Sequence, residues 1–186
     1  GLGLFVISRY VAMALFTAPD APDRFWAFRR CWFATSIGLT FSSVMAIDHV
    51  VRHPAMTPKK LLRWMAPFLL AYASVILFGQ FEPQPDRVIG WIPRLTPIWQ
   101  RVLSTTHSLF LIGFLAGCAL LAKKIPSRPI RQALAALAAG QLLLGIDGVV
   151  LAFGGWYFRP YLYSEILMLA ALWFAYDTGT RLQQTG

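Results

Sequence analysis

Three ionisable residues, His107, Asp147 and Glu165, stand inside long apolar segments of this 186-residue chain. Ionisable side chains are costly within hydrocarbon, so their presence there indicates a functional site. In such surroundings a lone carboxylate favours its neutral form, whereas a carboxylate beside Arg or His keeps its charge. A group of these residue types could bind a small polar ligand, relay protons, or respond to pH through His107.

These residues and Arg9 are expected at a similar depth in a membrane. With a rise of about 1.5 Å per residue, His107 and Glu165 lie roughly 13 Å and Asp147 about 9 Å from the same surface. We therefore predict a ligand-binding site made of Arg9, His107, Asp147 and Glu165 in the outer half of the bilayer. The alternative is that a neighbouring helix satisfies each polar group separately, or that a side chain extends to the surface.

The composition places this site in an integral membrane protein. Of the residues, 57% are hydrophobic and 13% are charged, about half the charged share of a soluble domain. The net charge of +9 comes from Lys and Arg residues that lie mostly between the apolar segments. Basic residues in loops orient a membrane protein and meet anionic lipid headgroups, so we expect the lipid bilayer as partner and no nucleic acid.

The elements that must position the site are membrane-spanning helices. Segments of roughly 20 apolar residues predict an all-α bundle of about six transmembrane helices with short loops, within one polytopic domain covering residues 1–186. The predicted spans are residues 2–17, 31–51, 64–80, 98–122, 130–153 and 156–176.

Two stretches outside these spans also carry predictions. The connection 81–97 is rich in proline and contains Trp91, so we expect an ordered segment in the membrane interface rather than a long helix. The polar residues 177–186 could begin a linker to a further domain.

The distribution of basic residues predicts the orientation. Nine Lys and Arg residues lie on the side that holds residues 52–63, 123–131 and the C-terminus, against seven on the other side. This bias favours a cytoplasmic C-terminus. We expect location in a bacterial inner membrane.

Other motifs are weaker. Serine-hydrolase, zinc-protease and phosphate-loop motifs are absent from the sequence, so we expect no enzymatic activity. His49 and His53 have a spacing that can serve a metal, but His53 precedes Pro54 at a helix end, and we predict no metal site. The sequence leaves the cofactor open.

Three further residue types have structural interpretations. Gln141 is expected to form an interhelical hydrogen bond, and Gly113 with Gly117 is expected to form a close-packing face. Cys31 and Cys118 fall near opposite faces of the bilayer, which argues against a disulfide.

The order of features from His107 to Tyr176 resembles the N-terminal membrane region of some bacterial sensor histidine kinases. The resemblance rests on the patterns of residues 107–113 and 128–133, on Asp147, and on the helix end at residues 173–176. It implies a non-enzymatic membrane module that senses a small ligand and passes the signal to a downstream cytoplasmic domain.

Two other functions remain open at this point. One is an accessory subunit of a larger energy-transducing or photosynthetic membrane complex, with haem, pigment or quinone as cofactor. The other is a small transporter or proton-coupled carrier that uses the same carboxylates.

Overall fold

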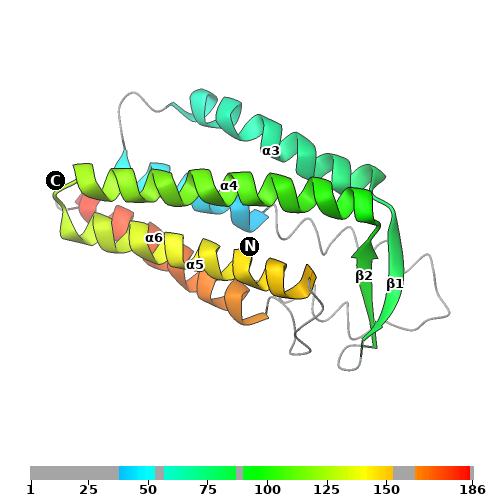
Figure 1. Ribbon diagram of the computed structural model, residues 1–186. Coiled ribbons are helices and arrows are strands. Elements are labelled where there is room, and N and C mark those ends of the chain that lie inside the picture. The colour runs from blue at the N-terminus through cyan, green and yellow to red at the C-terminus, as the bar shows by residue number, and fades with distance from the viewer. Residues whose placement is uncertain (1–37, 53–56, 87–89, 153–161, 185–186) are drawn as a thin grey trace.

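The computed structural model describes residues 38–52, 57–86, 90–152 and 162–184, which form five helices and one β-hairpin. Successive helices run in opposite directions, so their ends gather at two opposite ends of a bundle (Figure 1). Helix α5 packs against α4 and α6, and α3 packs against α4. The helices are Gly38–Val51, α3 (Pro58–Phe78), α4 (Pro97–Lys124), α5 (Arg128–Ala152) and α6 (Leu162–Gln184).

Three of these helices are long and apolar enough to cross a membrane, as the sequence predicts for an integral membrane protein. They are Lys59–Phe78, Pro97–Lys124 and Arg128–Val150, with mean hydropathies of 1.8, 1.7 and 1.8. The described helix Gly38–Val51 is shorter. Helix α6 is not among the three and carries Glu165, Asp177 and Arg181. The first predicted span, residues 2–17, lies outside the described residues.

The predicted start of α3 at Trp64 is wrong by six residues. Its true first turn is fixed by Thr57, whose hydroxyl accepts a hydrogen bond from the Lys60 amide at 3.4 Å, and by Pro58 in the first helical position. Both are favourable at a helix N-terminus, because the cap satisfies an unpaired amide and proline has none to satisfy. The lysines interpreted as loop residues therefore lie on the helix.

The proline-rich connection between α3 and α4 is a β-hairpin, which the all-α prediction did not include. Strand β1 (Phe81–Asp86) pairs antiparallel with β2 (Gly90–Leu95), with Phe81 opposite Leu95. Prolines are tolerated here because a two-stranded ribbon has only edge strands, where a missing amide interrupts few bonds. The Thr96 amide donates to the Gln80 carbonyl at 3.0 Å and closes the base of the hairpin.

The core lies between the helices, and the outer faces are apolar. Leu134, Leu137 and Met168 are fully buried. Outward-facing Ile112 is 66% exposed and Trp173 is 76% exposed. Large apolar side chains in these positions match a surface in contact with lipid, since water-exposed surfaces rarely carry large continuous apolar patches.

Candidate functional site

His107 lies on the inner face of α4 and contacts α3. Its Nδ1 atom is 2.9 Å from the hydroxyl of Tyr72, a residue only 4% exposed. The inner face continues one and two turns further with Phe110 and Phe114, which are also buried. The otherwise apolar inner face of α4 thus places the imidazole of His107 against the phenol of Tyr72, between α3 and α4.

The hydrogen bonding extends from Tyr72 to the helix Gly38–Val51 and on to α5. The Thr40 side chain hydrogen-bonds to Tyr72. The Ser43 hydroxyl donates to the Thr40 carbonyl at 2.7 Å and accepts from Nε2 of Gln141 at 2.9 Å. We call these five residues, from Gln141 through Ser43, Thr40 and Tyr72 to His107, the buried polar series. It joins four helices.

The Gln141 end of this series is incomplete. Gln141 is 0% exposed, and its Oε1 atom has no hydrogen-bond partner among the described residues. The two ends of a side-chain amide are assigned from their neighbours, but one end stays unpartnered whichever way the group is turned. A buried acceptor without a partner costs about 1–3 kcal/mol, so this atom is a place where a bound donor would be favoured.

Which way the Thr40 and Tyr72 hydroxyls donate determines which ring nitrogen of His107 carries the proton. If the Thr40 hydroxyl donates to the Tyr72 oxygen, the Tyr72 hydroxyl donates to Nδ1 of His107. That ring is then neutral and carries its proton on Nε2. A second proton on Nδ1 would require the Tyr72 hydroxyl to turn toward Thr40. Because hydroxyl groups both donate and accept, the bonds from Thr40 through Tyr72 to His107 can adopt either direction, whereas the Ser43 hydroxyl donates to the Thr40 carbonyl in both cases.

The Asp147 carboxylate belongs to a second group of contacts, between α5 and α6. The Ser164 hydroxyl donates to Oδ2 of Asp147. Ser164 is buried, and the next residue, Glu165, is 1% exposed in the first turn of α6. A carboxylate in this position is favoured by the positive end of the helix dipole.

Helix α5 separates His107 from Asp147. A Cβ atom built on Gly145 would lie 3.9 Å from Nε2 of His107, so the Gly145 side of α5 faces α4. Asp147 is two residues further along, a rotation of about 200° that directs it to α6. The same two residues add a rise of only about 3 Å. His107 and Asp147 thus lie at one level of the bundle on opposite faces of α5.

The structure therefore divides the residues of the predicted site. It brings Asp147 to Ser164, beside Glu165, and it brings His107 to Tyr72. Within the described part of the chain, no hydrogen bond joins the His107 ring to the Asp147 carboxylate. Arg9 lies outside the described residues.

His49 occupies a different place, near the end of the bundle where α6 finishes. Its ring centroid is 5.0 Å from that of Tyr176, and its Nε2 atom is 3.5 Å from Nε2 of Gln183. Gly179 leaves room for the ring, since a Cβ there would lie 2.5 Å from Cδ2 of His49. His53 lies outside the described residues, and among those described no cluster of three metal-ligating residues occurs.

Sequence reasoning identified part of the buried polar series. The predicted interhelical hydrogen bond of Gln141 is confirmed by its bond to Ser43. Tyr72, Thr40 and Ser43 were missed, although the three-residue spacing of Thr40 and Ser43 puts two hydroxyls on one face of an apolar helix. The Gly113–Gly117 face packs against none of the described residues, because nothing lies within 4 Å of a Cβ built at either position.

Comparison with protein-family models, with curated proteins and with solved structures finds no match for this chain. What defines the protein is therefore its own architecture: a helical membrane protein with a polar interior in part of its bundle.

Proposed function

We propose that this chain is a non-enzymatic integral membrane module that binds or senses a small polar ligand through the buried polar series. The observation that carries the proposal is the unpartnered end of the Gln141 amide, fully buried and connected by hydrogen bonds to His107. A group that served only to hold helices together would be satisfied at both ends, because each unmade bond lowers stability.

The arrangement suits sensing because the Gln141 amide and, through Tyr72, the His107 ring both connect to one turn of the helix Gly38–Val51. A ligand that donates to Oε1 of Gln141 also orients the amide toward Ser43, since the two ends of the amide turn together. The Ser43 hydroxyl donates to the Thr40 carbonyl, so this contact acts on the first turn of the helix Gly38–Val51, whose Thr40 side chain bonds to Tyr72. Binding thus acts on the helix that bonds to Tyr72, the hydrogen-bond partner of the one histidine in the series.

Orientation in a bacterial inner membrane is part of the same proposal. The described helix ends opposite the hairpin carry nine Lys and Arg residues, which favours that end as cytoplasmic. His107 then lies in the outer half of the bilayer. Helix α6 continues to Gln184 at the cytoplasmic end, where a signalling domain or other membrane subunits could receive the signal.

The proposal is tested with purified protein in lipid nanodiscs, using acetamide, acetate and ethylammonium as neutral, anionic and cationic probes. A probe present at 100 times its Kd should raise the free energy of unfolding by about 2.7 kcal/mol. Gln141→Leu and Tyr72→Phe should abolish this gain. Ser104→Ala is the matched control, because the Ser104 hydroxyl is exposed and bonds to the Gln100 carbonyl of its own helix at 2.8 Å.

Stabilisation that survives both variants, or no stabilisation by any of the three probes, would contradict the proposal. A visible absorption band of the purified protein would instead favour a subunit that binds haem or pigment. Uptake of a probe into sealed vesicles would favour a carrier.

A further inference from the structure

An apolar groove of about 300 Å³ lies between α5 and α6 on the outer surface of the bundle. Its lining includes small side chains with larger apolar ones beside them: Ala136, Ala139 and Gly140 from α5, and Leu167, Ala170 and Phe174 from α6. Ala139 and Ala170 are both exposed, so the floor is open to the surroundings of the protein. In a membrane those surroundings are hydrocarbon.

Basic side chains stand beyond one end of this groove. Arg128 precedes Ala139 by eleven residues, close to three full helical turns, so the two share a face of α5. Arg131 lies about 4.5 Å nearer to the groove along α5 and is rotated by about 80° from Ala139, toward α4, so its long side chain must reach around the helix to meet a headgroup at Arg128. Both arginines are exposed, and neither forms an ion pair with any described residue. On α6, Arg181 is already paired with Asp177 at 2.8 Å.

We propose that this groove binds an acidic phospholipid, with an acyl chain in the apolar part and the headgroup phosphate at Arg128 and Arg131. The charge pattern selects this occupant, because an apolar groove with unpaired arginines at one end matches an apolar chain with an anionic head. The groove begins about 12 Å from Arg128 along α5, a separation that fits within one leaflet, whose hydrocarbon is about 15 Å thick.

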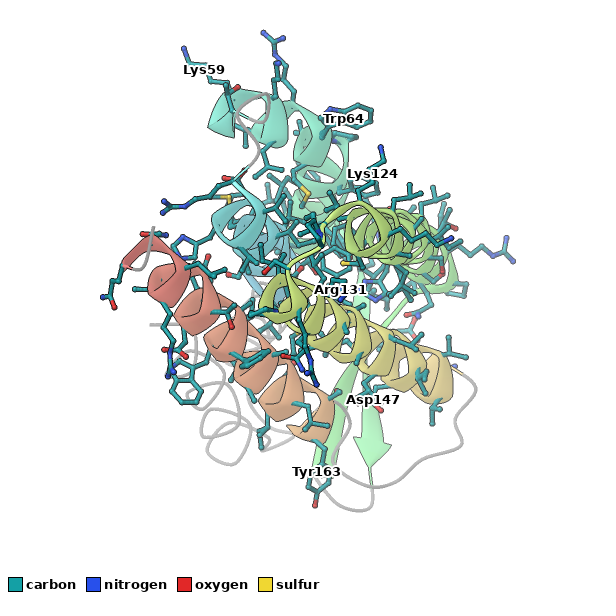
Figure 2. The ribbon with its side chains drawn as sticks, turned by 90° about the vertical axis from the view of Figure 1, so that its left-hand side faces the viewer. Lys59, Trp64, Lys124, Arg131, Asp147 and Tyr163 are labelled. Carbon is teal, nitrogen blue, oxygen red and sulfur yellow. The ribbon has the colours of Figure 1, made fainter. Side chains whose placement is uncertain are left out.

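Other basic residues at the same end of the bundle allow a local site to be told from a general positive charge. Figure 2 shows Lys59 on α3 pointing away from the other helices, whereas Arg131 is on α5. Lys124, at the last turn of α4, is a second exposed charge that is not on α5 or α6. Removing Lys59 and Lys124 changes the net charge as much as removing the two arginines.

The test is native mass spectrometry of the protein purified in detergent with equal amounts of phosphatidylglycerol and phosphatidylcholine. The wild-type protein should retain phosphatidylglycerol preferentially. Arg128→Gln with Arg131→Gln should weaken retention about five-fold for each charge removed. Lys59→Gln with Lys124→Gln should leave it within two-fold of wild type. Equal losses in the two double variants would overturn the proposal in favour of diffuse attraction.

A second pair of variants tests the apolar part of the groove. Ala139→Leu and Ala170→Leu fill the groove from exposed positions and should displace the lipid. Ala116→Leu, at an exposed position on α4, is the control and should not. Two results would overturn the proposal. One is retention of phosphatidylcholine equal to that of phosphatidylglycerol, and the other is a wild-type dimer that becomes a monomer in the groove-filling variants. The first result would remove the headgroup selectivity, and the second would make another copy of this chain the occupant.

Discussion

Replacing Tyr72 by phenylalanine removes one hydroxyl and with it two contacts of the buried polar series. The hydroxyl lies 2.9 Å from Nδ1 of His107 and also hydrogen-bonds to Thr40. Hydrogen bonds between membrane helices contribute about 0.6 kcal/mol on average and up to about 1.7 kcal/mol. Tyr72→Phe should therefore lower the free energy of unfolding by about 1–3 kcal/mol.

A double-mutant cycle separates the bond to His107 from the rest of this loss. His107→Phe removes the same bond from the other side, so the double variant loses that bond only once. The sum of the two single losses should exceed the double loss by about 0.6–1.7 kcal/mol. The measurement is equilibrium unfolding in bicelles, followed by tryptophan fluorescence and extrapolated to zero denaturant.

A second cycle tests whether α5 separates the two groups of polar residues. Ser164→Ala removes the donor to Asp147 on the α6 side of α5. Combined with His107→Phe, it should be additive within about 0.5 kcal/mol, because the two sites share no partner. Coupling of more than about 1 kcal/mol here would refute the division of the predicted site, and coupling near zero for Tyr72 and His107 would refute the series.

Two further predictions concern packing and orientation. Gly140→Ala should destabilise the protein by about 1–3 kcal/mol, because the new Cβ would lie 2.6 Å from Sδ of buried Met168 and 3.3 Å from its Cα. Gly113→Ala meets no atom within 4 Å and should be neutral or stabilise by up to about 1 kcal/mol in the same unfolding assay. A cysteine at Gln84 should react with an impermeant reagent added outside intact cells, and one at Ser127 should not. The reverse labelling pattern would invert the proposed orientation.

The sequence predicts α4 and α5 well because their signal is local. The predicted spans 98–122 and 130–153 agree within two residues at each end with α4 and α5. The start of α3 was misplaced because a lysine-rich stretch occurs equally in a loop and in the first turn of a helix. The cap at Thr57 and the proline after it were the signals that distinguish the two.

The hairpin could not be predicted from alternation of apolar and polar residues. Pro83, Pro85 and Pro93 occupy strand positions, and proline within a segment argues against a strand. The backbone nevertheless forms the ribbon because the bond from the Thr96 amide to the Gln80 carbonyl sets a register in which all three prolines fall in the non-hydrogen-bonded pairs, where no ladder amide is needed. Pairing of this kind depends on the register, which becomes visible only in three dimensions.

The polar residues inside the bundle were identified in part for a similar reason. His107 and Asp147 stand out in the sequence because ionisable residues are rare in apolar segments. Tyr72 does not stand out, because tyrosine is common in such segments. The expected depth of His107 and Asp147 could be counted along each helix. The direction of each side chain could not, because the rotation of α5 is set by its neighbours: Gly145 admits Leu111 and His107 on one side, and Gly140 admits Met168 on another.

Helix α5 consequently has the central place in the ligand response that we propose for this protein. Its Gln141 contacts the helix Gly38–Val51, its Gly145 contacts α4, and its Asp147 contacts α6. Under the proposed function, a ligand at the Gln141 amide would act on a helix that is bonded to α6 on another of its faces. Even a small rotation of α5 would change the distance between Asp147 and Ser164, because these side chains meet directly. Since α6 continues to Gln184, the proposed change would reach the basic end of the bundle along one continuous helix.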